Sequence, residues 1–181
     1  MSIIDKWNQW YKDLPQEPTI GLYGDSLTYE LGAEFLKDCE IVEDWGTGTG
    51  AFKLHRKDAI GIDGSNTPQA DKKVDLIEYT SSCDGIFMRH VLEHNKEWVK
   101  ILANALKSAK KICVIVSTPF TDKTTELTEI SARNKDYGVD VKSYSLDLRE
   151  FNRILKGYKV KKEVHGGDTI FYIERVKNES K

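Results

Sequence analysis

Hydrophobic residues recur at helical intervals in two segments that precede residue 41. In the first segment they are Ile4, Trp7, Trp10 and Tyr11. The second segment runs to about Lys37, and Asp25 or Ser26 can cap its start, because a short polar side chain accepts a hydrogen bond from an exposed backbone N–H. We therefore predict two helices ahead of the first strand.

From residue 41 the pattern changes to short apolar runs that are separated by turn residues. The predicted strands span residues 41–45, 59–62, 73–77, 85–88 and 112–116. Between the last two strands, residues 96–109 place their apolar side chains on one helical face, so this helix can cover the sheet and supply a right-handed crossover. Strands that alternate with helices in this way predict a parallel sheet.

The C-terminal part of the chain predicts a different arrangement. Residues 119–144 are polar and irregular, and we interpret this long connection as structure on the substrate side. Asp147 and Glu150 have the spacing of a capping box, which predicts a helix that starts there. Residues 158–165 and 169–176 then alternate apolar and polar side chains around a Gly-Gly-Asp turn, which predicts an antiparallel hairpin.

Composition agrees with one globular domain. The chain has 181 residues, of which 39% are hydrophobic and 31% are charged, and it contains no repeat. We expect a single domain over residues 1–181. The formal net charge of -2 gives no reason to expect a nucleic-acid partner, and the lysine-rich stretches 107–111 and 156–162 are typical of solvated faces.

The cysteines and the N-terminus bear on the cellular environment. Cys39, Cys83 and Cys113 match no metal-binding or disulfide spacing, so we interpret them as reduced structural thiols. The first ten residues lack the basic start and long apolar core of a signal peptide, and no apolar run is long enough to cross a membrane. We therefore expect a cytoplasmic protein without a membrane partner.

The most informative stretch is VEDWGTGTG, residues 42–50, where a predicted strand ends in three alternating glycines. Glycine at these positions lets the backbone approach a ligand closely. Asp44, at the strand end, can orient an ammonium group or a water molecule. The next strand ends in Asp63, whose carboxylate can accept hydrogen bonds from both hydroxyls of a ribose. These residues together predict a cleft for a nucleoside cofactor.

The glycine loop alone does not decide which cofactor binds. Gly46, Gly48 and Ala51 also satisfy the G-x-G-x-x-A form of a dinucleotide site, whereas Gly50 makes the tighter G-x-G-x-G form. A second signal is the sequence DGIFMRHVLEH at residues 84–94. With both signals, the chain resembles the class I S-adenosylmethionine-dependent methyltransferases, and HVLEH is similar to the form common in the small-molecule enzymes of that family.

The resemblance implies a set of cofactor contacts. Asp44 and the glycine loop would hold the methionine part, Asp63 the ribose, and Asp75 the adenine amino group, while Arg89 and His90 would border the cofactor and the substrate. The implied cofactor-binding residues are Asp44, Gly46, Thr47, Gly48, Gly50, Asp63, Gly64, Asp75, Leu76 and Arg89.

Methyl transfer from a sulfonium requires an aligned nucleophile and the exclusion of water, and some acceptors also require a base. His90 and His94 are the candidate catalytic residues, and His165 is a further imidazole that could accept a proton. His90, Glu93 and His94 also have the i, i+3, i+4 spacing of metal ligands. Small-RNA 2′-O-methyltransferases that bind a metal have a similar Glu-His sequence with an additional upstream glutamate, which His90 replaces here, and we predict no metal site.

Two positions depart from the family pattern. Glu43 occupies a strand position that is usually apolar, so its carboxylate needs a partner if it is buried. The span from Gly50 to Asp63 is short, which predicts an abbreviated first crossover helix.

Aromatic residues also precede the predicted sheet, where they could form a substrate lid or simply pack against the sheet edge. They are Trp7, Trp10, Tyr11, Tyr23 and Tyr29.

We therefore expect an α/β fold with a Rossmann-like, seven-stranded, mostly parallel sheet, an antiparallel C-terminal hairpin and helices on both faces. Residues 1–40 would form an N-terminal helical cap and residues 41–176 the core. The expected function is methyl transfer from S-adenosylmethionine to a small-molecule or sugar-type acceptor, with S-adenosylhomocysteine as the product. Two alternatives stay open, namely an NAD-dependent oxidoreductase and a noncatalytic module that binds S-adenosylmethionine.

Overall fold

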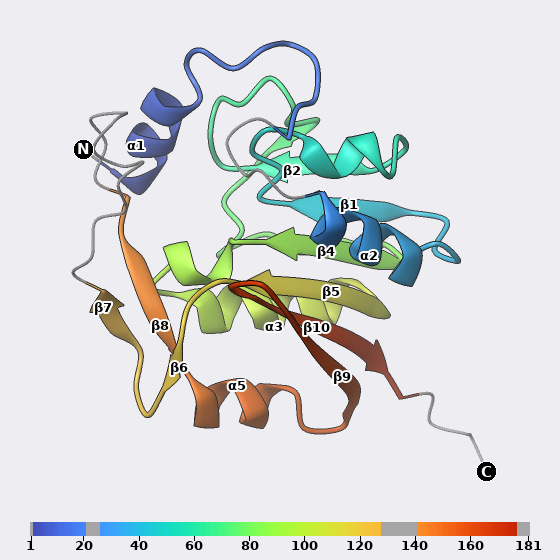
Figure 1. Cartoon of the computed structure of the whole chain (residues 1–181), viewed down its shortest axis with the longest axis vertical. Coiled ribbons are helices and arrows are strands. Elements are labelled where there is room, and N and C mark those ends of the chain that lie inside the picture. The colour runs from blue at the N-terminus through green and yellow to red at the C-terminus, as the bar shows by residue number, and fades with distance from the viewer. Residues whose placement is uncertain (1, 21–25, 128–140, 177–181) are drawn as a thin grey trace.

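The computed structural model describes residues 2–20, 26–127 and 141–176, and its centre is a seven-stranded sheet with the strand order β3-β2-β1-β4-β5-β10-β9 (Figure 1). The strands are β1 Val42–Trp45, β2 Ile60–Asp63, β3 Lys72–Lys73, β4 Gly85–Arg89, β5 Lys111–Val116, β9 Tyr158–His165 and β10 Asp168–Arg175. Strands β1 to β5 pair in parallel, whereas β10 runs antiparallel to both β5 and β9. This topology confirms the predicted sheet and its C-terminal hairpin.

Helices cover both faces of the sheet, as predicted (Figure 1). Helix α2 (Leu27–Phe35) and the 3-10 turn η2 (Ala51–Leu54) pack on one face, and α3 (Trp98–Ser108) and α5 (Leu148–Ile154) pack on the other. Central strands supply side chains to both cores in alternation: Phe87 of β4 stacks on Phe52 with ring centroids 4.0 Å apart, while its neighbour Met88 joins the opposite core. The sheet is therefore buried on both sides, which explains its continuous apolar runs.

The first crossover after β1 is abbreviated, as the short span from Gly50 to Asp63 predicts. Only the single turn η2 lies there, and its Phe52 side chain is fully buried.

Ser26 stands at the start of α2, but its hydroxyl donates to the Glu30 carboxylate instead of capping the helix. Asp25, the other predicted cap, lies outside the described residues.

The predicted strand at residues 73–77 is wrong beyond its first position. Strand β3 covers only Lys72–Lys73, and the chain then turns, because the Asp75 carboxylate accepts a hydrogen bond from the backbone N–H of Ile77 at 2.9 Å. The side chain of Asn104 in α3 donates to the carbonyls of Leu76 and Ile77. A local carboxylate bond of this kind competes with the strand ladder and favours a turn.

The segment predicted as irregular from 119 to 144 contains strands at both of its ends. Strands β6 (Phe120–Thr121), β7 (Thr125–Leu127) and β8 (Ser143–Asp147) form a small sheet in the order β6-β8-β7, and residues 128–140 lie outside the described part. The Asp147 side chain then caps α5, as predicted, by accepting from the N–H groups of Arg149 and Glu150. Glu150 pairs with Arg153 one turn further on.

Glu43 is buried and fully partnered. Its two carboxylate oxygens accept hydrogen bonds from the Trp45 indole at 2.8 Å, the Ser81 hydroxyl at 2.8 Å and the Tyr79 hydroxyl at 3.0 Å, with the Lys72 ammonium 3.6 Å away. The cluster attaches the irregular segment after β3 to the centre of the sheet. Glu43 is therefore a structural carboxylate with a complete set of donors.

Helix α1 (Ile3–Trp10) stands apart from both cores. Ser2 and Asp5 form its capping box, and Trp10 and Tyr11 pack with Val141 in a third, small cluster that also includes Trp7 and Leu14. In Figure 1, α1 lies beyond the ends of the central strands.

None of the helices in the described ranges has the length and apolar character needed to cross a bilayer. Cys39, Cys83 and Cys113 are buried free thiols.

Candidate functional site

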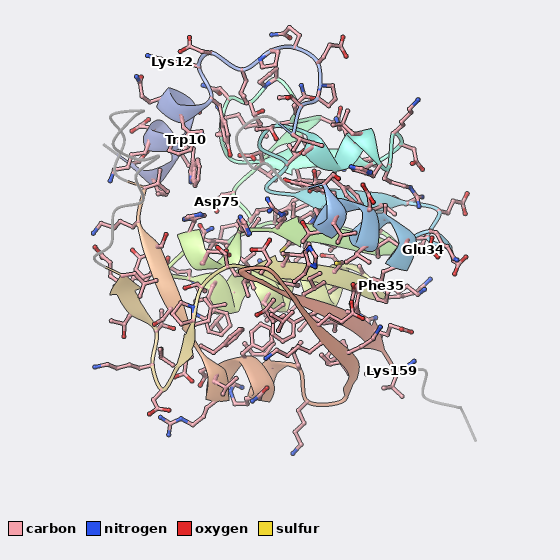
Figure 2. The ribbon with its side chains drawn as sticks, viewed as in Figure 1. Trp10, Lys12, Glu34, Phe35, Asp75 and Lys159 are labelled. Atoms are coloured by element: carbon pink, nitrogen blue, oxygen red, sulfur yellow. The ribbon has the colours of Figure 1, made fainter. Side chains whose placement is uncertain are left out.

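A cavity of about 410 Å³ lies at the C-terminal ends of β1, β2 and β4, with α1 on its far side. Open α/β sheets bind ligands at this end. The predicted site residues that line it are Asp44, Gly46, Thr47, Gly48, Asp63, Gly64, Asp75, Leu76, Arg89, His90 and His94. Figure 2 shows Trp10 on α1 and Asp75 on the other side of this region. Sequence elements separated by most of the chain therefore meet around one cavity.

The glycine loop has the backbone conformation that its sequence suggests. Gly46, Gly48 and Gly50 have φ angles of 77°, 49° and 71°, in the left-handed region that other residues rarely adopt. Close packing adds a second constraint, because a Cβ on Gly46 would lie 2.4 Å from the Val91 side chain and one on Gly48 would lie 2.8 Å from the Tyr11 hydroxyl. Gly50 lies outside the cavity lining and packs against Gln69.

Asp63 links the end of β2 to that loop. Its Oδ2 accepts a hydrogen bond from the Gly48 N–H at 3.0 Å, and its Oδ1 accepts from the N–H of Ser65 at 2.8 Å and from the Ser65 hydroxyl at 2.7 Å. A carboxylate offers about four acceptor positions. Asp63 thus accepts from three donors, one of them in the loop, and retains capacity for a ligand hydroxyl, and more if the Ser65 hydroxyl rotates away.

Asp44 is 3% exposed at the end of β1. Burial raises the pKa of its carboxyl to about 7 and the nearby charge of Asp63 acts in the same direction, while the Thr47 hydroxyl and the Lys53 ammonium oppose the rise. A buried carboxyl of this kind takes up a proton unless a cation lies next to it. Asp44 is therefore suited to bind a cationic group that enters the cavity.

Asp75 and Leu76 form the opposite wall. The Asp75 side chain is exposed at the turn that replaces the end of the predicted strand, whereas Leu76 is 8% exposed and packs into the core. Asn104 and the Glu43 cluster hold this turn against the body of the protein. The wall therefore presents a carboxylate beside an apolar surface, although it is not part of a strand.

Asp168 does not line the cavity, but it contacts two residues that do; its sequence context indicated only a hairpin turn. Its carboxylate receives the Arg89 guanidinium at 3.2 Å and the His90 Nε2 at 3.0 Å. Burial acts to raise the pKa of Asp168, but the hydrogen bond with His90 and the charges of His90 and Arg89 bring it below its ordinary value. Because a carboxylate only accepts, the His90 proton lies on Nε2. The sequence around Asp168 predicted a hairpin turn and gave no indication that its side chain contacts Arg89 and His90.

Arg89 and His90 are held tightly at the end of β4. The Arg89 side chain also donates to the Thr28 hydroxyl at 3.0 Å and to the Tyr29 hydroxyl at 3.2 Å, and its guanidinium lies 4.8 Å from the centre of the Tyr29 ring. His90 has a φ of 56°, which is uncommon outside glycine. Strained backbone of this kind is found where the surrounding contacts determine a functional geometry.

His94 lies on the short 3-10 turn η3 (Leu92–His94). Its Nδ1 is 3.0 Å from the Lys142 carbonyl, so Nδ1 carries the proton and Nε2 is the basic nitrogen. Burial lowers the pKa of His94, while the charge of Glu93 and the hydrogen bond to Lys142 oppose this shift. The imidazole is therefore neutral at physiological pH. Glu93 does not line the cavity and accepts from the N–H and hydroxyl of Ser117.

The aromatic residues of the N-terminal segment form another wall of the cavity. The half-buried Trp7 ring stacks on Tyr11 at 5.5 Å, meets Trp10 edge-on at 5.8 Å and contacts His94 at 5.3 Å. Tyr29 also lines the cavity and belongs to the core beneath α2, and Tyr23 lies outside the described residues. His165 is exposed at the end of β9 and does not line the cavity.

Across residues 2–20, 26–127 and 141–176, no group of three or more His, Cys, Asp or Glu side chains is arranged to hold a metal ion. His90, Glu93 and His94 have different partners in spite of their helical spacing, namely Asp168, Ser117 and the Lys142 carbonyl. Within the described residues, the polar groups that line the cavity include three carboxylates, two imidazoles, the Arg89 guanidinium and the backbone of the loop.

Comparison with known proteins relates this fold to methyltransferases. No protein-family model matches the sequence, and no curated protein matches it. Among solved structures, magnesium protoporphyrin IX methyltransferase (ChlM) from Synechocystis PCC 6803 with bound SAH superposes with a TM-score of 0.62 at 15% identity, over 96% of this chain and 98% of that one. An O-methyltransferase family protein from Burkholderia thailandensis gives 0.59 at 14% identity, over 84% of this chain and 55% of that one.

A third similar structure is a chain from the "complex between the Haloferax volcanii Trm112 methyltransferase activator and the putative methyltransferase", with a TM-score of 0.63 at 12% identity over 99% of this chain and 100% of that one. At identities this low, the superpositions establish the fold only, and the function has to be argued from the residues of the site. The chain therefore has the class I methyltransferase fold.

Proposed function

We propose that this protein is an S-adenosylmethionine-dependent methyltransferase that acts on a small-molecule acceptor. The observation that carries the proposal is the convergence of Asp44, the glycine loop and Asp63 on one cavity at the C-terminal ends of the parallel strands. One of the solved structures with a similar fold was determined with bound SAH, and this supports the same assignment.

The residues of the cavity fit this cofactor. The buried Asp44 carboxyl, with its pKa raised to about 7, would be compensated by the amino group of the methionine part. The left-handed Gly46 and Gly48 shape the loop that borders the cavity, and Asp63 has remaining acceptor capacity for a ribose hydroxyl. The cavity of about 410 Å³ falls within the ~300–1,000 Å³ typical of small-ligand sites.

When bound, the cofactor supplies an activated methyl group on a sulfonium sulfur. The chain has to align the acceptor with that group and keep water out. Trp7, Trp10 and Tyr11 cover the cavity from α1 and suit the second task. Walls built from separate elements would limit how the acceptor can be oriented.

Two imidazoles could take the proton that an acceptor hydroxyl or amine loses. His94 is neutral and has its basic Nε2 defined by the bond from Nδ1 to Lys142, while Asp168 fixes the ring of His90. We assign His94 as the candidate base and His90 as the second candidate. Both residues line the cavity.

The experiment that tests this proposal is calorimetric titration with S-adenosylmethionine, S-adenosylhomocysteine and NAD. We expect the first two ligands to bind and NAD not to bind. Asp63→Ala should weaken binding at least about tenfold, or ~1.4 kcal/mol. Asp58→Ala is the matched control, because Asp58 is an exposed carboxylate that pairs with Arg56 away from the cavity.

The alternatives give different results. Binding of NAD alone would refute the methyltransferase proposal in favour of an oxidoreductase. Binding of S-adenosylmethionine without methyl transfer to any acceptor in a screen would indicate a noncatalytic module.

A further inference from the structure

The charges that line the cavity are unbalanced. Three carboxylates, those of Asp44, Asp63 and Asp75, belong to the lining, and no lysine does among the described residues. The basic side chains of the described lining are Arg89, His90 and His94. Burial keeps His94 neutral, so the cationic character of the cavity comes from Arg89.

Asp168 cancels that cationic character. Its two oxygens are divided between the Arg89 guanidinium at 3.2 Å and the His90 ring at 3.0 Å, and all three side chains are largely buried. An ion pair removed from water in this way offers little attraction to a second anion. An acceptor that carries a carboxylate or phosphate would have to compete with Asp168 while facing the other carboxylates.

The wall formed by α1 suits a flat apolar ring. Trp7 is half-buried, so part of its indole borders the cavity, and Ile4 and Tyr11 line the same side. Aromatic surfaces of this kind bind planar rings by stacking or edge contacts worth about 0.5–1.5 kcal/mol beyond area burial. The His94 ring, 5.3 Å from Trp7, places a neutral base beside that surface.

We propose that the acceptor is a flat aromatic small molecule without an anionic group, and that Asp168 sets this preference by neutralising Arg89. The proposal rests on the proposed function in that it treats the aromatic end of the cavity as the acceptor site. It assigns Asp168 as a specificity-determining residue and Trp7 as the ring-binding surface.

A matched series of phenols tests the charge preference: p-cresol is neutral, tyramine carries an ammonium and 4-hydroxyphenylacetate carries a carboxylate. Each would be titrated by calorimetry at pH 8, with S-adenosylhomocysteine present and absent. We expect the neutral and cationic phenols to bind at least about tenfold more tightly than the anionic one, which corresponds to ~1.4 kcal/mol. Equal or tighter binding of the carboxylate would overturn the proposal.

Asp168→Asn tests whether Asp168 determines specificity, because loss of a purely structural role would not change the preference among the three phenols. The substitution leaves Arg89 without its carboxylate, so affinity for 4-hydroxyphenylacetate should rise and the discrimination should fall to about threefold or less. Asp122→Asn removes one exposed negative charge elsewhere and should leave the discrimination unchanged. An unchanged discrimination in Asp168→Asn would overturn the assignment of Asp168.

Trp7→Ala should weaken all three phenols at least about threefold, and Trp7→Phe should retain most of the affinity because it keeps a ring. Val164→Ala, at a side chain that is 68% exposed on β9, is the control. If Trp7→Ala does not fold, Trp7→Phe and the charge series on the unmodified chain still decide the result. Failure to bind S-adenosylhomocysteine with the phenol preference intact would refute the proposed function while leaving the chemistry of the cavity as inferred.

Discussion

Asp63 accepts a hydrogen bond from the backbone N–H of Gly48 at 3.0 Å, and this bond joins the carboxyl end of β2 to the loop that follows β1. The same carboxylate is proposed to meet the ribose. One side chain therefore connects the shape of the glycine loop with ligand binding, so changes to the loop should affect stability and affinity together.

Gly48→Ala should reveal that connection. A Cβ at a φ of 49° has a conformational cost of about 1–2 kcal/mol, and it would lie 2.8 Å from the Tyr11 hydroxyl. We expect the free energy of unfolding, measured by urea titration, to fall by at least about 1 kcal/mol and the affinity for S-adenosylhomocysteine to fall with it. Gly167→Ala is the control, because nothing lies within 4 Å of its added Cβ. Equal stability of the two variants would contradict the prediction.

Asp44 should couple cofactor binding to proton release. Its pKa is raised to about 7 mainly by burial, and a bound ammonium favours the ionised carboxylate and lowers that pKa. Binding below and near pH 7 should therefore release a proton, and affinity should increase as the pH rises through this range. Calorimetry in buffers of different ionisation enthalpy measures the released proton. Asp44→Asn should bind more weakly and release none from this position, whereas Asp58→Asn should behave as the unmodified chain.

His94 should make the folded protein sensitive to acid. Burial lowers its pKa in the folded state, so the unfolded chain binds the proton more readily. The corresponding stability is present above the unfolded pKa of about 6.5 and is lost as the pH falls below it. The decrease in melting temperature between pH 7.5 and pH 5 should be smaller in His94→Gln than in the exposed-site control His165→Gln. Identical decreases would contradict this account of His94.

Glu43 should be important for stability even though it does not line the cavity. Glu43→Ala leaves the Trp45 indole and the Tyr79 and Ser81 hydroxyls without their acceptor, and we expect a loss of about 3 kcal/mol or more in urea unfolding. The exposed Glu78→Ala in the same segment should change stability by less than about 0.5 kcal/mol. The affinity for S-adenosylhomocysteine should fall as well, because the cluster holds the turn that carries Asp75. A loss of stability without any loss of affinity would show that this turn does not bind the cofactor.

Much of the fold could be predicted from the sequence because its signals are local. The spacing of apolar residues predicted most strands of the large sheet and α3, and the short span after Gly50 predicted an abbreviated crossover, which is the single turn η2. The strand at 73–77 was wrong because the Asp75 carboxylate bonds its own backbone and starts a turn. Strands β6 to β8 were missed because they are short and polar, and their pairing joins residues that are distant in the sequence.

The sequence by itself determined the glycine loop, Asp44 and Asp63, because a strand end and a left-handed turn are specified by a few adjacent residues. Only the tertiary structure decided that Asp168 meets Arg89 and His90, that Glu43 has donors from three segments, and that Trp7 lies beside His94. These contacts depend on how the hairpin, the segment after β3 and α1 pack against the sheet. Packing brings together side chains whose separation along the chain carries no signal of their contact, and so the charge and the aromatic wall of the cavity emerge only in the folded protein.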